Sequence, residues 1–412
     1  MKLVVVGKGG REHALAQKLK SSPLVTDLWV APGNPGMQQA GFSCVNCESA
    51  EAIEKFCIDN GVSLVVVGPE ALILSDLKLR LQKHGIACFA PSMEVAQLES
   101  SKLFCKGVLK DAGVRTAACQ VSYSEDQALL VVGKHDFKSP LVVKADGLAQ
   151  GKGVWVCNTW DMAEEAVRTL GRHFGFPLLL EECLIGKELS AFALCDGEDF
   201  VILGTACDYK RVSSDPFSAN TGGMGAYSPC DFVNEADEAE IRSIFSKTLK
   251  TLRDKRLPYQ GFLFAGLMKT NEGIYVLEYN VRMGDPETQA LLPRLKTDLA
   301  GLIMKAVTHQ LKNEVCELAS ESSVHVVATS EGYPGSPMKL GNPITAKVLS
   351  APDRHLYFAG VSRINDQLVN VGGRVLGITA LGSTREEARE KVYQEMQAVN
   401  FDGMYLRQDI GL

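Results

Sequence analysis

The amino-acid sequence predicts an α/β protein whose N-terminal domain is a doubly wound parallel sheet. The run Lys2–Val6 is rich in valine, which is typical of a strand buried on both faces. Strand-like and helix-like segments then alternate for about a hundred residues, as they do in parallel sheets covered by helices. Beyond that point strands and glycine turns dominate, which indicates a second architecture.

The first domain is expected to contain a helix and four strands. The helix spans Arg11–Lys20, and the strands after Lys2–Val6 are Leu28–Val30, Leu64–Val67 and Cys88–Phe89. Polar or glycine-rich segments follow three of these strands, namely Gly7–Gly10, Ala31–Gly36 and Gly68–Glu70. Ligands of open α/β sheets bind at the carboxyl ends of the strands, so this edge is a candidate site.

The rest of the chain is expected to be mostly strands, with two helices. The predicted strands are Leu141–Lys144, Gly151–Val156, Leu178–Glu182, Phe192–Cys195, Val201–Leu203, Gly261–Met268, Gly273–Asn280, Val324–Ala328 and Val371–Leu376. A charged helix is expected between Pro229 and about Arg256, and another from Thr384.

The composition narrows the class of protein. A chain of 412 residues is long enough for roughly two to four domains. Its net charge of −6 gives it no bulk attraction for nucleic acid or anionic lipid. The 12 cysteines are scattered through the chain, which is typical of a reducing compartment. No apolar run approaches the about 18 residues of a membrane span. We therefore expect a cytoplasmic protein with no nucleic-acid or membrane partner.

The N-terminal glycine turn is a candidate phosphate site. Gly9 and Gly10 open a helix after a strand, and free N–H groups at a helix N-terminus bind phosphate. Arg11 would add a fork-shaped cation. A dinucleotide fingerprint would need Gly at position 12, where the chain has Glu12, and an acidic residue after the second strand, where it has Gly33 and Asn34. A phosphorylated small molecule is thus favoured over NAD, and a turn without a ligand is the alternative.

A second glycine turn lies between the strands expected at 141–144 and 151–156. It carries Gly151, Lys152 and Gly153, but a strand follows where a P-loop has a helix. A glycine hairpin of this kind is typical of a flap over a triphosphate, and Lys144 at the preceding strand end would face the same phosphates. A surface hairpin without a ligand is the alternative.

Two further groups of residues could hold ligands. Glu278 and Asn280 lie two positions apart at a strand end, so their side chains share a face, and two oxygen donors suit Mg²⁺ beside phosphates. A solvated strand end is the alternative. The glycine-dense stretch 220–229 follows Asp208, Lys210 and Arg211, which offer partners for both charges of a small amino acid.

Together these segments resemble the ATP-grasp ligases, and among them the phosphoribosylamine–glycine ligase family. The resemblance covers nearly the whole chain. It is carried by Gly7–Ala14, Ala31–Asn34, Val67–Glu70, Lys144–Ala149, Asn220–Pro229 and Arg282–Gln289, in the order of the family.

The resemblance implies three domains and a nucleotide site. The domains are 1–100, an ATP-grasp domain 101–315 with two α+β lobes and a flap lobe at about 118–188, and a small β-rich domain 316–412. ATP is implied at Lys102, Lys144, Gly151, Lys152, Gly153, Glu181, Glu182, Leu184 and Glu188, where Glu181–Leu184 holds adenine and Glu188 the ribose. Mg²⁺ or Mn²⁺ is implied at Glu278 and Asn280.

The resemblance also implies the reaction. The carboxylate of glycine attacks the γ-phosphorus of ATP, and the amine of 5-phosphoribosylamine then displaces phosphate from glycyl phosphate, a step of de novo purine biosynthesis. The implied catalytic residues are Arg282, Asp208 and Lys144, and the implied substrate residues are Gly9, Gly10, Arg11, Gly33, Asn34, Glu70, Asp208, Gly223, Met224 and Arg282. A monomer or weak dimer is expected.

Departures from the family pattern concern Cys207, where the family usually has Gln, Gln150 in the flap, and the stretch 213–219. The first two are expected to shift glycine or ATP contacts, and the third loop mobility. Three rivals are a ligase for another acid, a non-catalytic nucleotide-binding regulator and an NAD-dependent oxidoreductase. The regulator is opposed by the presence of Lys144, Glu278 and Asn280, and the oxidoreductase by Glu12.

Overall fold

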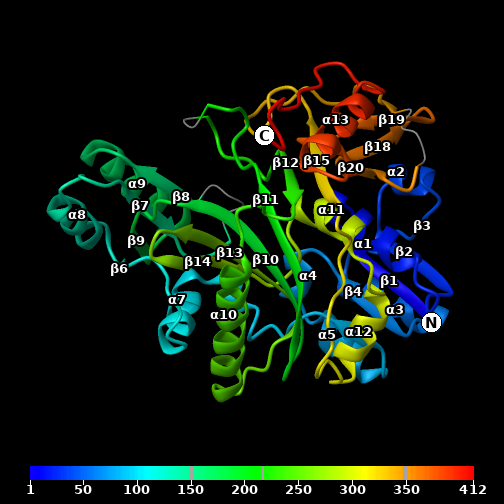
Figure 1. Ribbon diagram of the computed structural model, residues 1–412, viewed down its shortest axis with the longest axis horizontal. Coiled ribbons are helices and arrows are strands. Elements are labelled where there is room, and N and C mark those ends of the chain that lie inside the picture. The colour runs from blue at the N-terminus through cyan, green and yellow to red at the C-terminus, as the bar shows by residue number, and fades with distance from the viewer. Residues whose placement is uncertain (149–152, 216–217, 347–350) are drawn as a thin grey trace.

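The N-terminal region is built on a five-stranded sheet with the order β3-β2-β1-β4-β5, in which every pair of neighbours is parallel (Figure 1). The structure is a computed structural model that describes residues 1–148, 153–215, 218–346 and 351–412. The strands are β1 (Lys2–Gly7), β2 (Asp27–Pro32), β3 (Ser43–Cys44), β4 (Leu64–Val67) and β5 (Ala87–Phe89). The helices are α1 (Gly10–Lys20), α2 (Pro35–Gln39), α3 (Ala50–Asn60), α4 (Glu70–Ile73), α5 (Leu77–Lys83) and α6 (Gln97–Ser100).

Strand β1 is buried on both faces, as its apolar run predicts. Leu3 and Val5 belong to one hydrophobic cluster with residues of α1 and of α12 (Leu299–Val307). Val4 and Val6 belong to a second cluster with residues of α3 and α5. Successive side chains of a strand point to opposite faces, so both faces need a cover of helices. The predicted doubly wound sheet is confirmed.

The centre of the molecule is an eight-stranded sheet with the order β14-β13-β10-β11-β12-β15-β20-β17, in which neighbours are antiparallel. Its strands are β10 (Lys187–Asp196), β11 (Phe200–Asp208), β12 (Gly225–Ser228), β13 (Gln260–Thr270), β14 (Gly273–Asn280), β15 (Ser322–Thr329), β17 (Arg354–Phe358) and β20 (Arg374–Gly382). The short strand β12 joins β11 to β15, so one sheet runs from the middle of the chain into its last hundred residues (Figure 1).

A separate lobe lies on one side of this sheet (Figure 1, left). It has a four-stranded sheet with the order β6-β9-β7-β8 and its own hydrophobic cluster. Its elements are β6 (Cys119–Ser122), α8 (Glu125–Lys134), β7 (Leu141–Ala145), β8 (Val154–Cys157), α9 (Trp160–Phe174) and β9 (Leu178–Glu182). Helix α9 lies outside the predicted elements, although Ala163, Ala166, Val167 and Leu170 have helical spacing on its buried face.

The remaining elements complete the middle and the end of the chain. They are α7 (Lys102–Asp111), α10 (Glu235–Asp254), α11 (Glu287–Leu291), a 3₁₀ turn (Leu292–Arg294), β16 (Thr345–Ala346), β18 (Val361–Ile364), β19 (Gln367–Asn370), α13 (Arg385–Met396) and β21 (Val399–Asn400). The bounds of the strand expected at Val371–Leu376 are wrong, because β19 ends at Asn370 and β20 begins at Arg374. Gly373 packs against the Tyr333 ring and marks the turn between them. Within the described ranges, no helix has the length and apolar character needed to cross a membrane.

Candidate active site

Three cavities lie in a row where the N-terminal sheet, the eight-stranded sheet and the separate lobe meet. We name them the inner cavity (about 30 Å³), the central cavity (about 230 Å³) and the outer cavity (about 840 Å³). The inner and central cavities share four lining residues, Glu99, Lys102, Glu278 and Asn280. The central and outer cavities share Asp285. A ligand in one cavity therefore lies beside a ligand in the next.

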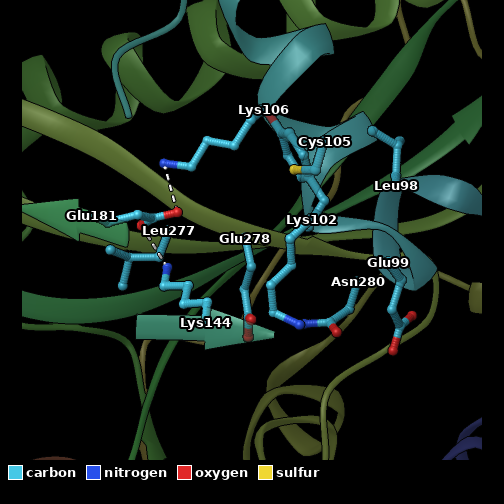
Figure 2. Close-up of a pocket in the computed structure, with 11 residues that line it drawn as sticks. Leu98, Glu99, Lys102, Cys105, Lys106, Lys144, Glu181, Leu277, Glu278 and Asn280 are labelled. Atoms are coloured by element: carbon cyan, nitrogen blue, oxygen red, sulfur yellow. Dashed lines mark ion pairs between the residues drawn. The ribbon is translucent and has the colours of Figure 1, made fainter. Parts of the chain in front are cut away.

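Lysines and one buried glutamate line the inner cavity (Figure 2). The Glu181 carboxylate, at the end of β9, lies 2.8 Å from Lys144 Nζ and 3.1 Å from Lys106 Nζ. Strands β7 and β9 pair with Val142 opposite Glu181, so Lys144 is the diagonal neighbour of Glu181 on the same face. Lys144 thus lies where the flap interpretation expects it, but it is paired with a carboxylate.

Lys102 reaches the same cavity from the first turn of α7. Its Nζ donates to the Gly147 carbonyl at 2.9 Å, and burial lowers its pKa. The Asp146 carboxylate accepts from the Leu103 N–H at 3.1 Å and from Ser101 Oγ at 3.2 Å. Asp146 therefore ties the end of β7 to the start of α7, and it keeps Lys102 beside Gly147.

Glu278 and Asn280 lie at the end of β14 and line both the inner and the central cavity (Figure 2). The register of β13 and β14 shifts here, because Gly266 pairs with Glu278 and Leu267 with Val276, which leaves Leu277 as a bulge. The side chains share a face, as their spacing predicts. Within the described parts of the chain, no three His, Cys, Asp or Glu side chains form a metal-binding group. A carboxylate and an amide oxygen suit Mg²⁺ when phosphate oxygens complete its shell.

Asp208 at the end of β11 and Lys210 in the following loop line the central cavity, whereas Glu188 of β10, expected at the ribose, does not. Lys210 Nζ lies 2.6 Å from Glu188 Oε2 and 3.1 Å from Asp208 Oδ1. Burial opposes its charge, but Asp208 and Glu188 hold the pKa of Lys210 well above its ordinary value. Asp208, Glu188 and Lys210 neutralise one another. An amino acid or a ribose can therefore bind to them only if its own polar groups replace some of these contacts.

Arg282 is held at the wall of the central cavity by two carboxylates. Its Nη2 lies 2.8 Å from Glu99 Oε1, and its Nε lies 3.6 Å from Glu70 Oε2. The other oxygen of Glu99 accepts from the Val281 N–H at 2.8 Å, which fixes the carboxylate. Glu70 thus holds a candidate anion-binding residue in place. Glu99 was not predicted, and its position in the short helix α6 carries no motif.

Glu287 is a second acidic residue of the central cavity that was not predicted as a ligand. It stands in the first turn of α11, and Ser190 Oγ donates to its Oε1 at 3.1 Å. Burial first, and the nearby Asp208 carboxylate second, raise the pKa of Glu287 to about 7. A carboxyl group with this pKa exchanges protons near neutral pH.

The N-terminal turn is arranged differently from the expected phosphate cradle. The buried Arg11 donates to Glu12 Oε1 at 2.6 Å and to the Met283 carbonyl at 3.2 Å. The Gly9 N–H donates to Glu12 Oε2 at 2.8 Å. The Glu12 carboxylate therefore accepts from groups that were expected to hold phosphate, and Gly10 packs against Gln289. Gly9 lines the outer cavity.

Gly33 and Asn34 line the outer cavity, as their strand-end position predicts. Asn34 Oδ1 accepts from the Met37 N–H at 2.9 Å, and its amide group donates to the Lys8 carbonyl at 2.8 Å. Lys8, together with Arg374 of β20, supplies the cations of this cavity. Arg374 comes from the last hundred residues and has no local signal.

Some of the other expected ligand residues line the three cavities, and some do not. Gly153 lines the central cavity, whereas Gly151 and Lys152 are outside the described residues. The Glu182 carboxylate accepts from the Ala118 N–H at 2.8 Å. Among the residues that line the described cavities, Glu182, Leu184, Gly223 and Met224 do not occur, while Thr221 and Gly222 do.

The glycine residues of the 220–229 stretch explain part of this placement. Gly223 has φ +109° and packs against Pro286. The Met224 side chain is fully buried, and its N–H donates to the Tyr209 carbonyl at 2.8 Å. Gly223 and Met224 thus pack beneath the residues that line the central cavity and do not line it themselves. Cys207 is buried beside Tyr227 on β12, on the face of β11 opposite Asp208, so its thiol is directed away from the central cavity.

Comparisons with known proteins identify the class. The chain matches the models of the phosphoribosylglycinamide synthetase N domain over residues 1–99, of the ATP-grasp (A) domain over residues 100–288 and of the C domain over residues 323–412. It is 39% identical to phosphoribosylamine–glycine ligase of Caldanaerobacter subterraneus, with 100% of this chain and 99% of that protein covered. It is 40% identical to the enzyme of the same name from Rhodopirellula baltica, with 99% and 96% covered.

Solved structures agree with this assignment. A crystal structure of phosphoribosylamine–glycine ligase from Thermotoga maritima has a TM-score of 0.84 and 32% identity, with 100% of both chains covered. A biotin carboxylase from Campylobacter jejuni has a TM-score of 0.74 at 15% identity, with 98% and 92% covered, and shares the fold alone.

The fold and the lysine-lined site therefore define an ATP-grasp ligase. The chain belongs to the phosphoribosylglycinamide synthetase family, whose members are named phosphoribosylamine–glycine ligase. The predicted fold class, family and enzyme class are confirmed.

Proposed function

We propose that this protein ligates glycine to 5-phosphoribosylamine while ATP is split into ADP and phosphate, and that glycyl phosphate is the intermediate. The observation that supports this most directly is the row of three adjoining cavities, with Glu278 and Asn280 in the wall between the first two. The reaction needs adjoining sites for a nucleotide, an amino acid and a phosphorylated amine, in the order of this row. The nucleotide would extend beyond the inner cavity, whose volume is about 30 Å³.

ATP is assigned to the inner cavity and its mouth. Lys102, Lys106 and Lys144 would contact its phosphates, and the Glu181–Lys144 pair would open for them. Glu278 and Asn280 would hold Mg²⁺ or Mn²⁺, which when bound neutralises charge on the transferred phosphoryl group. The pair of oxygen donors fits this role because both line the cavities that the triphosphate spans.

Glycine is assigned to the central cavity. Its carboxylate would lie against Arg282 and attack the γ-phosphorus, so that the bond from that phosphorus to the β,γ-bridging oxygen breaks and ADP leaves. Its ammonium would lie between the carboxylates of Asp208 and Glu287. These groups align the reactants and neutralise charge, which is the main requirement of phosphoryl transfer.

5-Phosphoribosylamine is assigned to the outer cavity. Lys8 and Arg374 are the cations that would contact its phosphate, and Gly33 and Asn34 would lie beside the sugar. The amine would reach the acyl carbon past Asp285, which both cavities share. The C–N bond forms as the C–O bond to phosphate breaks. Because an acyl phosphate hydrolyses in water, exclusion of water from the site during the reaction would favour the amide.

The test is the release of ADP by the purified protein with each substrate omitted in turn. Phosphoribosylamine is unstable, so it is generated in the assay from ribose 5-phosphate and ammonia. The proposal expects ADP only when glycine and phosphoribosylamine are both present. Equal turnover with another amino acid in place of glycine would favour the rival ligase, and phosphate release across a set of amino acids separates the two.

We further propose a cytoplasmic monomer or weak dimer. All 12 cysteines are free thiols, and burial raises the pKa of several of them, such as Cys88 to about 12. Such thiols are typical of a reducing compartment. Sedimentation velocity at several protein concentrations measures the oligomeric state.

A further inference from the structure

The chain from Asp208 to Val212 has two faces with different neighbours. Asp208 and Lys210 line the central cavity. Tyr209, between them, points the other way, because successive side chains of an extended chain alternate. Its ring packs on the segment 405–412, where the Arg407 guanidinium lies 5.1 Å from the ring centre. Asp208 and Lys210 thus face the central cavity, and Tyr209 between them contacts the segment 405–412 on the opposite side.

Hydrogen bonds from the segment 405–412 reach three residues of this stretch. The Gly411 N–H donates to Tyr209 Oη at 3.0 Å. Arg407 Nη1 donates to the Arg211 carbonyl at 2.9 Å, and Tyr405 Oη donates to the Val212 carbonyl at 3.1 Å. Backbone hydrogen bonds hold the stretch on its other side, because the Tyr209 N–H donates to the Gly225 carbonyl and the Val212 N–H to the Ala219 carbonyl, both at 3.0 Å. The bonds from 405–412 therefore add a second support to this stretch.

The segment 405–412 is itself rigidly held. Arg407 is buried, and its guanidinium forms a forked pair with Asp409 at 2.8 and 2.6 Å. Tyr393 Oη of α13 donates to the Arg407 carbonyl at 2.6 Å and accepts from the Ile410 N–H at 3.1 Å. Buried forked pairs of this kind fix geometry. A support fixed on α13 can therefore fix the loop that it contacts.

We propose that Tyr209 and Arg407 are positioning residues that hold Asp208 and Lys210 in the geometry that binds glycine. The inference rests on the proposed function, because glycine is assigned to the central cavity there. Neither residue lines the described cavities, so both act through the loop. Without this support, the loop would populate conformations that do not bind glycine. The apparent affinity for glycine would then fall in proportion to the population of the binding conformation.

The test compares Tyr209→Phe, Arg407→Lys and Arg407→Ala with the wild type. Tyr209→Phe removes the hydroxyl and keeps the ring, and Arg407→Lys keeps the charge and loses the fork. Loss of one such hydrogen bond changes an equilibrium about fivefold. We expect the KM for glycine to rise about fivefold in Tyr209→Phe and Arg407→Lys, and more in Arg407→Ala, with kcat at saturating glycine within about twofold of the wild type.

The matched control is Tyr275→Phe, which removes a hydroxyl that donates to Glu272 at 2.9 Å on the hairpin of β13 and β14. We expect it to leave the KM for glycine unchanged. A role in stability alone would lower the yield of folded enzyme and leave this KM as it is. If Arg407→Ala does not fold, Tyr209→Phe and Arg407→Lys decide the question.

Amide hydrogen exchange gives a readout that does not depend on the reaction. The Thr221 and Met224 N–H groups donate to the carbonyls of Lys210 and Tyr209 at 2.7 and 2.8 Å. Faster exchange at both amides in Tyr209→Phe supports the positioning role, and unchanged exchange together with an unchanged KM overturns it. A wild type that releases no ADP with both substrates contradicts the proposed function instead, and the exchange measurement still decides the positioning role.

Discussion

Glu181 and Lys144 form a buried ion pair of 2.8 Å in the cavity assigned to nucleotide phosphates. The same carboxylate lies 3.1 Å from Lys106, so one anion neutralises two ammonium groups. A bound triphosphate would bring further anions to these lysines. Glu181 therefore neutralises Lys144 and Lys106 whenever no nucleotide phosphate is bound to them.

This relationship predicts the behaviour of Glu181→Gln. Removing one partner of a buried pair leaves charge uncompensated and costs on the order of 3 kcal/mol. Nucleotide would then supply the missing negative charge. We expect a lower Tm without ligand and a larger rise in Tm on adding ADP than in the wild type. The control is Glu182→Gln, because the Glu182 carboxylate accepts from Ala118 N–H outside the cavity. Equal rises in all three proteins would contradict the idea.

The second prediction concerns the metal pair. Glu278→Ala removes the only carboxylate of the pair at the end of β14, so the transferred phosphoryl group loses charge stabilisation. We expect kcat to fall by about a hundredfold or more, with a higher Mg²⁺ concentration needed for half-maximal rate. Initial rates of ADP release over a magnesium series measure both effects. Glu272→Ala, at the far end of the same hairpin, serves as the control. Full turnover by Glu278→Ala would refute the assignment.

The third prediction uses the buried carboxyl group of Glu287. Its pKa of about 7 lies above its ordinary value of 4.5, chiefly because of burial and then because of Asp208, while Lys210 acts in the opposite direction. The folded protein thus binds more protons than the unfolded chain between these values, and the free energy of unfolding falls as pH rises through this window. The loss amounts to about 3 kcal/mol.

Glu287→Gln should remove this loss, because the amide does not ionise. We expect the variant and the wild type to differ little at pH 4.5, and the variant to be more stable at pH 8, in thermal unfolding without substrates. Glu272→Gln, an exposed carboxylate, should show no such dependence on pH. A stability difference that is the same at both pH values would contradict the raised pKa.

The fourth prediction concerns the packing of Glu12 at the carboxyl edge of the parallel sheet. A Cβ added at Gly68 would overlap the Glu12 side chain. That side chain is 4% exposed and is held by the Gly9 N–H and Arg11, so it has little room to move. Overpacking of this kind costs about 1–3 kcal/mol, which chemical denaturation of Gly68→Ala measures.

Gly107→Ala is the matched control for this change. Gly107 lies in α7, and an added Cβ would meet nothing within 4 Å. Alanine is favoured over glycine in a helix by about 1 kcal/mol, so this variant should be more stable than the wild type. If both variants change stability in the same direction, the explanation by overlap with Glu12 is wrong.

The sequence predicted the fold where local patterns decide it. The run Lys2–Val6 shows a strand with two buried faces, and the spacing of Glu278 and Asn280 shows a shared face. The ion pair of Glu181 with Lys144 depends on the register of β7 against β9, which no local pattern gives. Glu99 likewise acquires its role only because α6 lies beside the end of β14.

The expected phosphate site at the N-terminal turn shows a second limit of prediction from sequence. The glycine turn and Arg11 were placed correctly along the chain, but the motif gave no information on where the Glu12 side chain folds. A carboxylate one residue after Arg11 competes with a ligand for the same donors. The cations of the outer cavity instead come from Lys8 and from Arg374, which is distant in sequence.

The eight-stranded sheet has a consequence for dividing the chain into pieces. Strand β12 pairs with β11 on one side and with β15 on the other. A gene fragment that stops between β14 and β15 would leave β12 as a bare edge, and bare edges recruit strands from other molecules. Such a fragment should precipitate on expression. The lobe with the sheet β6-β9-β7-β8, which has its own apolar centre, is the better candidate for independent production.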